Sequence, residues 1–378
     1  MPYLAPDPPL TFSDLVGLLQ PAPASGVQPA GLFFASGRAA LLAGLRAIGV
    51  GPGDEVLLPA YLCESVVTTV ETVGARPTYY PVSRRLRPDL ARLEAAIRPE
   101  TKAVVLIHYL GFPGPVEAVR ELCARRGVAL IEDCAHALYS RLGDRPLGSY
   151  GDLAIFSPWK SLPLPDGGLL SANRPDLVPE RPETRPSVPR SVVRLAYRAL
   201  GSMEQAIGWS PRLALLQRPG LRRSMHTQVS AGPVAVKAGS ALAWRLLQRA
   251  DAALVVARRR QHYGRLLTVC RTLSWAQPLF DELPAGVCPL GLPLVAEDRD
   301  HWRDRLLQLG VNVRTYWEHL PASVDLEQNP DAAWLRDRIL VLPVHQGLST
   351  RSVEWLARLL PMLPERIEHA TIADRKRG

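Results

Sequence analysis

The stretch KAVVLIHYLGFPGPVEAVRELCARRGVALIEDCAH, residues 102–136, contains an apolar run, a helix-like pattern and a second apolar run. The helix pattern covers 115–126 and ends at Gly127, and each flanking run has the length of a strand. A helix that joins two strands returns the chain to the same edge of the sheet, so the strands are parallel. Because continuous apolar strands are typical of a sheet covered on both faces, this stretch predicts an α/β protein.

The same alternation extends over residues 31–173. A helix pattern begins near Ser36 and ends at Gly49, and others cover 63–73 and 88–97. Between the helix patterns lie further apolar runs of strand length: EVLLPA (55–60), RPTYYPV (76–82) and DLAIFS (152–157). The sequence therefore predicts a three-layer α/β sandwich with a mainly parallel sheet.

Residues 174–250 interrupt this rhythm with a Pro- and Arg-rich start, and a long helix pattern follows from about Asp251. We interpret 1–250 as a large domain with a divergent basic segment at 174–250, and 251–378 as a smaller C-terminal α/β domain. The net charge is +9, and residues 174–260 hold 16 Lys or Arg against 5 Asp or Glu. This excess has two interpretations. It indicates either an anion-binding site, for a nucleotide diphosphate or an acidic membrane surface, or a solvent-exposed face enriched in Arg by codon usage.

The composition excludes several classes of protein. Hydrophobic residues make up 47% and charged residues 21% of the 378 residues, as in globular proteins. No apolar run approaches the ~20 residues of a membrane span. The start MPYLAPDPPL lacks the features of a signal peptide, and the five cysteines show no metal-binding spacing, so we expect free thiols in a cytoplasmic protein without a metal. We expect no nucleic-acid partner, because no basic stripe interleaved with aromatics is present.

Several polar residues follow predicted strands, where parallel sheets collect their functional groups. Asp133 follows VALIE, Ser157 and Lys160 follow DLAIF, and a turn over 59–63 follows EVLL. Ser36 and Gly37 stand at a helix N-terminus, which suits a phosphate. Each feature alone is common, but all of them fall in one predicted sheet.

Lys160 is one of four lysines among 45 basic residues. A position that needs only a positive charge accepts Arg, whereas a position that needs a neutral primary amine does not. The retained Lys160 is therefore a candidate nucleophile.

In order and spacing these features resemble the DegT/DnrJ/StrS-type sugar aminotransferases, which are fold-type I pyridoxal-phosphate enzymes. The matching stretches include ASGRAALLAGLRAIGVGPGDEVLLPAY (35–61), GVALIEDCAHAL (127–138), GSYGDLAIFS (148–157) and KSLPLPDGGLLSAN (160–173). The likeness is dense over 31–173, thin over 174–250, and returns in RRRQHYGRLL (258–267), GVNVRTYW (310–317) and LVLPVHQGLS (340–349).

The resemblance implies a role for each matching residue. Lys160 would form the Schiff base with pyridoxal 5'-phosphate and move protons, and Asp133 would face the pyridine nitrogen. The remaining implied cofactor contacts are Ser36, Gly37, Arg38 and Ser157 at the phosphate, together with His136. Ser157 and Lys160 are three residues apart, whereas the common family form has five.

Two parts of the predicted site differ from the family. The aromatic residue that stacks on the cofactor ring is expected near residue 63, where this chain has Cys63, and Tyr61 is the alternative. The family's Gly-x-Asn-x-Arg segment, which reaches the neighbouring subunit's cofactor, is not recognisable after residue 174. Three further residues in family-like stretches are candidates for contact with the substrate: Arg314, Tyr316 and His345.

The resemblance implies an aminotransferase that moves an amino group from an amino acid such as glutamate to a nucleotide-linked keto-sugar. It also implies a homodimer. A pyridoxal-phosphate sugar dehydratase is a second hypothesis, which Lys160 disfavours because such relatives have His at that position. A non-catalytic regulatory descendant is the third, motivated by Cys63 and the missing inter-subunit segment and opposed by Lys160 with Asp133.

Overall fold

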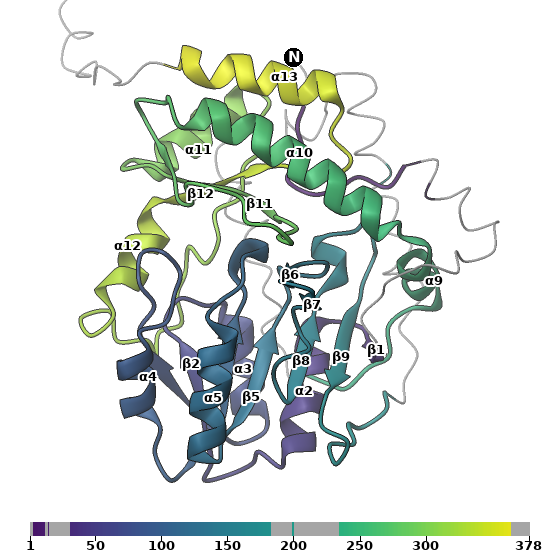
Figure 1. Ribbon diagram of the computed structural model, residues 1–378, viewed down its shortest axis with the longest axis vertical. Coiled ribbons are helices and arrows are strands. Elements are labelled where there is room, and N and C mark those ends of the chain that lie inside the picture. Colours follow the sequence, from purple (N-terminus) through teal and green to yellow (C-terminus); the bar gives the residue numbers. More distant parts are fainter. Residues whose placement is uncertain (1–2, 12–13, 15–30, 183–198, 200–233, 364–378) are drawn as a thin grey trace, which may run out of the picture.

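The computed structural model describes residues 3–11, 14, 31–182, 199 and 234–363, and the account below concerns these residues. The predicted basic segment 174–250 therefore lies largely outside the described residues. Two sheets organise the fold, a large one below and a small one above in Figure 1.

The large sheet has seven strands in the order β1-β9-β8-β5-β4-β2-β3. Four neighbouring pairs are parallel, from β3 across to β8, and β9 and β1 complete one edge in antiparallel register. The strands are β1 (Leu32–Phe34), β2 (Glu55–Pro59), β3 (Arg76–Tyr80), β4 (Thr101–Ile107), β5 (Ala129–Asp133), β8 (Leu153–Phe156) and β9 (Gly168–Ala172). The predicted mainly parallel α/β sheet is confirmed.

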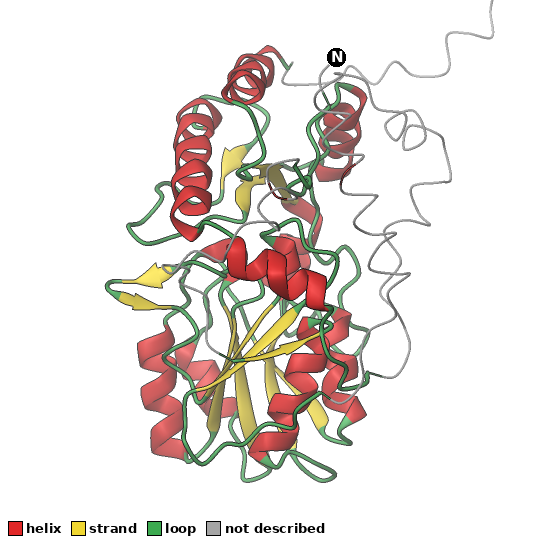
Figure 2. Ribbon diagram, turned by 90° about the vertical axis from the view of Figure 1, so that its right-hand side faces the viewer, coloured by secondary structure: helices red, strands yellow, loops and turns green. Residues whose placement is uncertain are grey.

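Helices cover both faces of this sheet (Figure 2). They are α2 (Gly37–Ile48), α3 (Glu64–Thr72), α4 (Leu90–Ala96) and α5 (Val116–Arg126). The strands β2, β4, β5 and β8 are almost entirely buried, as expected of strands between two helical layers. A short hairpin of β6 (Arg141–Leu142) and β7 (Arg145–Pro146) precedes β8.

Local sequence signals determine where α2 begins and ends. The Ser36 side chain accepts a hydrogen bond from the N–H of Ala39 and caps the first turn. Gly49 ends the helix in the left-handed conformation, with φ of 80°, which glycine adopts without a steric penalty. The helix N-terminus is thereby placed beside the carboxyl ends of the central strands.

The smaller sheet is antiparallel and contains β10 (Gln277–Pro278), β11 (Gly291–Val295) and β12 (Ile339–Pro343). Helices pack around it: α10 (Ala252–Cys270), α11 (Arg299–Gln308), α12 (Pro330–Arg338) and α13 (Thr350–Leu359), and α9 (Ala241–Arg249) precedes them. The start of the chain also joins this part, because Leu4 pairs with Val311 in a parallel bridge. No helix among the described residues is long and apolar enough to cross a membrane.

Candidate active site

The strand-end residues predicted from the sequence lie together at the carboxyl ends of the parallel strands of the large sheet, below the small sheet. We call this side of the sheet its carboxyl edge. Asp133 ends β5, and Ser157 directly follows β8, which pairs with β5 in parallel. Lys160 ends a single 3-10 turn, η2 (Pro158–Lys160), and its N–H donates to the carbonyl of Ser157 at 3.0 Å. The N-terminus of α2 reaches the same edge through Gly37 and Ser157.

The backbone at Gly37 is in close contact with Ser157. A Cβ built on Gly37 would overlap Ser157 Oγ, and one built on Gly168 would overlap the Ser36 carbonyl. Only glycine permits both approaches, which places the Ser157 hydroxyl against the first turn of α2. The first N–H groups of a helix have no partner within the helix, so hydroxyl and amide donors converge here. Arg38, at the second position of α2, is partly buried.

Lys160 is partly buried and electrostatically linked to Asp133. Burial lowers the pKa of its ammonium, and the nearby charge of Asp133 opposes this effect. A lowered pKa increases the fraction of the neutral amine, which is the nucleophilic form. The short turn after β8 therefore presents an amine with a lowered pKa at the carboxyl edge of the sheet.

Asp133 is buried, and its Oδ1 accepts the N–H of Ala135 at 2.9 Å. Burial raises the pKa of this carboxyl, whereas the charge of Lys160 acts in the opposite direction. A buried carboxylate in an apolar end of a sheet favours a cationic partner. A protonated ring nitrogen, as in pyridoxal phosphate, satisfies that preference.

His136 lies in an aromatic cluster. Its ring is nearly parallel to that of Trp317, with an angle of 9° and centroids 5.7 Å apart. The N–H of Leu110 approaches His136 Nδ1 at 3.4 Å, and burial lowers the pKa of the imidazole well below its usual range. Nδ1 is thus an acceptor on a neutral ring, which leaves Nε2–H as a donor.

The two candidates for the stacking residue have different surroundings. Tyr61 is buried and edge-on to Trp317, with centroids 4.6 Å apart, and its hydroxyl donates to the carbonyl of Tyr316 at 3.2 Å. Cys63 is partly exposed, directly precedes α3, and accepts a hydrogen bond from Ser65 Oγ at 3.1 Å. Cys63 is also close enough to Lys160 to influence the pKa of the amine.

The three residues proposed to contact the substrate separate into two places. Arg314 and Tyr316 line a small cavity of about 30 Å³ together with Lys160. His345 is instead bonded to the N-terminal segment, since its Nε2 lies 3.0 Å from the carbonyl of Ala5. All five cysteines are free.

Three further residues at this site were not predicted from the sequence. Asp7 lines the cavity of Lys160 and forms an ion pair with Arg314. Arg259 is fully buried, and Trp317 has a left-handed backbone with φ of 52°, an uncommon conformation for a bulky side chain. Asp7 gave no signal, because neither local pattern nor spacing indicates such a long-range contact. Arg259 and Trp317 lie in the family-like stretches 258–267 and 310–317, and this was the only available signal.

Arg259 connects the small domain to the turn that carries Lys160. Its guanidinium donates to the carbonyl of Ser161 at 2.8 Å, to those of Pro289 and Leu290 at 3.0 and 3.1 Å, and to Gln346 Oε1 at 2.9 Å. Four hydrogen bonds on one buried guanidinium fix α10 against the residue that follows Lys160.

Among the described residues, His108, Glu132 and Cys134 are close enough to hold a metal ion. Their polar atoms already have partners, however. His108 Nε2 lies 3.0 Å from Glu132 Oε2, and the N–H of Gly114 donates to His108 Nδ1 at 3.1 Å. Burial raises the pKa of the Cys134 thiol well above its usual range, which disfavours the thiolate that binds metals. We therefore interpret this cluster as structural.

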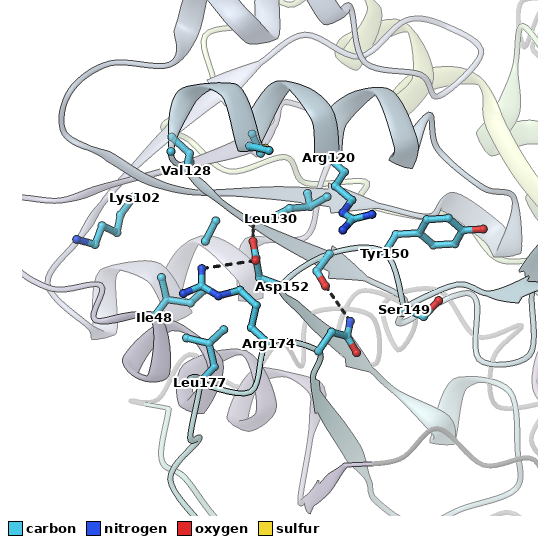
Figure 3. A pocket seen from close by; sticks show the side chains of 16 residues that line it. Ile48, Lys102, Arg120, Val128, Leu130, Ser149, Tyr150, Asp152, Arg174 and Leu177 are labelled. Carbon is cyan, nitrogen blue, oxygen red and sulfur yellow. Dashed lines mark hydrogen bonds and ion pairs between the residues drawn. The ribbon is translucent and has the colours of Figure 1, made fainter.

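A larger cavity of about 580 Å³ lies at the opposite edge of the sheet, next to the start of β5 and the residues before β8. Figure 3 shows its polar side chains, including Arg120, Tyr150 and the ion pair of Arg174 with Asp152. The groups predicted to carry the chemistry, Lys160 and Asp133, do not line it.

The residues at the carboxyl edge fit the parts of pyridoxal phosphate. Ser36, Gly37 and Ser157 lie together at the first turn of α2 as a cradle of hydroxyl and amide groups, and helix N-terminal donors bind phosphates well. Lys160 supplies an amine with a lowered pKa, and Asp133 supplies a buried carboxylate. The fold, a mainly parallel sheet with helices on both faces, is that of the fold-type I pyridoxal-phosphate aminotransferases.

Residues 26–182 match the model of the DegT/DnrJ/EryC1/StrS aminotransferase family. The chain is 38% identical over 182 residues to a dTDP-4-dehydro-2,3,6-trideoxy-D-glucose 4-aminotransferase of Saccharopolyspora spinosa, a match that covers 47% of this chain and 44% of the relative. It is 38% identical over 144 residues to a UDP-N-acetyl-3-dehydro-alpha-D-glucosamine 3-aminotransferase of Acidithiobacillus ferrooxidans, covering 37% and 39% of the two chains.

The chain thus matches less than half the length of these curated relatives. The similarity of structure extends further. The crystal structure of the aminotransferase TlmJ from Streptoalloteichus hindustanus superposes with a TM-score of 0.68 at 26% identity, over 93% of this chain and 96% of that one. The resemblance and the fold predicted from the sequence are therefore confirmed.

Proposed function

We propose that this protein is a pyridoxal-phosphate-dependent aminotransferase that moves an amino group from an amino acid, such as glutamate, to a nucleotide-linked keto-sugar. The observation that supports this most directly is the convergence of Lys160, Asp133 and the Gly37–Ser157 cradle at one sheet edge. The two curated relatives are named as aminotransferases of nucleotide-linked keto-sugars, in agreement with this substrate class.

Each residue of the edge would then have a defined task. Ser36, Gly37 and Ser157, with the N-terminus of α2, would bind the phosphate. Arg38 would add its backbone N–H at the same place. Bound there, pyridoxal phosphate would supply an aldehyde that condenses with amines and a ring that withdraws electrons.

The proton chemistry would belong to Lys160 and Asp133. Lys160 Nζ would hold the cofactor between turnovers, and its neutral form would remove and return the proton at the reacting carbon. Asp133 would keep a proton on the ring nitrogen through its negative charge. His136 would donate from Nε2 to a cofactor oxygen, and Trp317 and Tyr61 would exclude water from this end of the sheet.

The test begins with the purified protein and added pyridoxal phosphate. We expect a visible absorbance band, and reduction with borohydride followed by mass spectrometry should locate the added mass on Lys160. Lys160→Ala should lose both signals. Lys102→Ala is the matched control, because Lys102 is an exposed lysine at the start of β4 and should keep both. A band that persists in Lys160→Ala would contradict the assignment.

The reaction is tested by adding substrates to the cofactor-loaded protein. Glutamate should shift the visible band, and a keto-sugar should restore it with formation of an amino sugar. The sugars named in the two relatives, dTDP-4-dehydro-2,3,6-trideoxy-D-glucose and UDP-N-acetyl-3-dehydro-alpha-D-glucosamine, are the first to assay. No shift with any common amino acid would argue against an aminotransferase.

We further propose that the protein is a cytoplasmic homodimer. Its five free cysteines are compatible with a reducing compartment. Light scattering during size-exclusion chromatography measures the mass in solution against the 41.5 kDa chain, and fractionation of cells measures the location. A chain-sized mass at all concentrations would exclude the dimer.

A further inference from the structure

The N-terminal segment Tyr3–Leu10 packs along the small domain and reaches the cavity of Lys160. The N–H of Leu4 donates to the carbonyl of Gly310 at 2.8 Å, and the N–H of Asn312 donates to the carbonyl of Leu4 at 3.0 Å. Farther along, His345 Nε2 contacts the carbonyl of Ala5. These contacts hold the segment against His345 and against residues 310–312, which directly precede Arg314 in the chain.

The sequence of this segment restricts its conformation. Asp7 lies between Pro6 and the pair Pro8-Pro9, and prolines fix their own backbone while keeping the preceding residue extended. Pro9 packs tightly against the small domain, since a Cβ built on Gly347 would lie 2.7 Å from its Cδ. Asp7 is thus presented to the cavity by a stiff segment that loses little entropy in holding it there.

Asp7 forms an ion pair with Arg314 inside this cavity. Both side chains keep partial exposure, 30% for Asp7 and 33% for Arg314, so both can be reached from solvent. Burial by itself would lower the pKa of Arg314, but the charge of Asp7 and its hydrogen bond outweigh burial and raise it. Asp7 therefore stabilises a cation whose burial would otherwise be unfavourable.

The other charges that face the cavity explain why this pair matters. Arg259 also lines it, but its guanidinium is already bonded to three carbonyls and to Gln346. In the proposed function, Lys160 holds the cofactor and moves the proton at the reacting carbon. Among the described residues that line the cavity, Arg314 is thus the cation best placed to receive a carboxylate, and Asp7 is the carboxylate it already holds.

We propose that Asp7 competes with the amino donor for Arg314. The carboxylate of Asp7 pairs with Arg314 at the position that a carboxylate of the donor takes during turnover. The donor carboxylate must displace Asp7 before it pairs with Arg314. Asp7 thereby weakens the binding of acidic donors and acts as a residue that determines specificity. This inference rests on the proposed function in assuming that the donor is an amino acid.

The test measures binding of glutarate, a dicarboxylate that has neither an amino nor a keto group and cannot react. Calorimetric titration of the cofactor-loaded protein gives its Kd without any turnover. Asp7→Asn keeps the size of the side chain and removes its charge, so we expect glutarate to bind at least about tenfold more tightly, which corresponds to about 1.4 kcal/mol. In parallel, KM for glutamate should fall by a similar factor while kcat stays within about twofold.

Three further variants separate competition from other effects. Asp331→Asn removes a carboxylate from an exposed pair with Arg84, neither of which lines the cavity, and should leave the Kd for glutarate unchanged. Arg314→Gln should abolish glutarate binding, and Asp7→Asn should bring no gain when Arg314→Gln is also present. Pentane-1,5-diol has the five-carbon chain of glutarate but no charge. Because it does not compete with Asp7 for Arg314, its Kd should be the same for wild type and Asp7→Asn.

The results distinguish this inference from its alternatives. Unchanged or weaker glutarate binding in Asp7→Asn, with a melting temperature showing that the variant is folded, would overturn it; weaker binding would mean that Asp7 merely positions Arg314. If Asp7→Asn is unfolded, Asp7→Ser provides the same comparison. Tighter glutarate binding in a protein that shows no reaction with glutamate would support competition at Arg314 and refute only the aminotransferase.

Discussion

Gly37 and Ser157 approach each other so closely that any side chain on residue 37 would overlap the Ser157 hydroxyl. One residue begins α2 and the other follows β8, and they are 120 positions apart in the sequence. Their contact joins the helix N-terminus to the strand that leads to Lys160. The residues proposed to bind the phosphate and the proposed reactive amine of Lys160 are therefore held close together by this contact.

Gly37→Ala should weaken cofactor binding, because the added methyl group forces Ser157 and the first turn of α2 apart. We expect at least a tenfold increase in the Kd for pyridoxal phosphate, which is about 1.4 kcal/mol, measured by titration of the visible band. Gly264→Ala is the control: it lies within α10, where nothing stands within 4 Å of a built Cβ. That change should raise the free energy of unfolding by about 0.5–1 kcal/mol and leave the Kd unaltered.

Glu132→Gln should destabilise the fold. Glu132 accepts the N–H groups of Gly148, Tyr150 and Gly151 at 2.9, 2.7 and 2.6 Å, in addition to its contact with His108. The carboxylate accepts hydrogen bonds with both oxygens, whereas the Gln amide has only one oxygen. Buried N–H groups therefore lose their acceptor, at a cost of about 3–5 kcal/mol in the free energy of unfolding. Denaturation in urea measures the loss, and an unchanged free energy of unfolding would contradict this prediction.

The same residue predicts how stability depends on pH. Burial alone would raise the pKa of Glu132, but the hydrogen bonds and charge of His108 and the N–H groups of Gly151 and Gly148 outweigh it and lower the pKa below its ordinary 4.5. A depressed native pKa contributes stability above 4.5 that is lost as the pH falls through the native value. Wild type should lose stability over this acidic range more steeply than Glu132→Gln.

Asp133→Asn should bind the cofactor but lose most of its activity. An amide cannot stabilise a proton on the ring nitrogen by charge, so we expect kcat to fall by about 100-fold or more. Asp152→Asn is the control, because Asp152 lines the cavity at the opposite edge of the sheet and pairs there with Arg174. A folded Asp152→Asn variant should retain the visible band and kcat, and an equal kcat in wild type and Asp133→Asn would refute the role of Asp133.

The pKa of Asp133 also affects how the stability of the cofactor-free protein depends on pH. Burial raises its native pKa above the ordinary 3.8, with Lys160 opposing, so the folded state binds the proton more tightly than the unfolded state. Stability then decreases as the pH rises from 3.8 through the native pKa. The free energy of unfolding of Asp133→Asn relative to wild type should increase over this range, and a constant difference would refute the raised pKa.

Arg259→Met should loosen the connection between the small domain and the turn of Lys160. The change leaves the buried carbonyls of Pro289 and Leu290 without their donor, whereas that of Ser161 keeps Gln346 Nε2, at a cost of about 3 kcal/mol in the free energy of unfolding. We also expect a lower kcat, because Lys160 directly precedes Ser161. Arg265→Gln breaks an exposed pair with Glu354 and should change neither quantity appreciably. Equal effects of the two substitutions would contradict this role of Arg259.

Much of the large sheet and of the helices that cover it could be predicted from local sequence. The apolar runs at 102–107 and 128–133 with a helix between them determine a parallel pair, and Ser36 and Gly49 determine where α2 begins and ends. Lys160 and Asp133 followed from the chemistry of their side chains at strand ends. These signals are local because caps and strand periodicity depend on neighbours within a few residues.

The environment of the site was decided only by the tertiary structure. Asp7 meets Arg314 across 307 positions of the sequence, Trp317 covers His136, and Arg259 reaches the turn after Lys160. His345, predicted from the sequence as a substrate contact, lies against the N-terminal segment, with its Nε2 3.0 Å from the carbonyl of Ala5. Sequence by itself determined which residues are candidates for the chemistry, since that depends on side-chain type and local backbone. Which charges surround them depends on long-range packing, which no local pattern encodes.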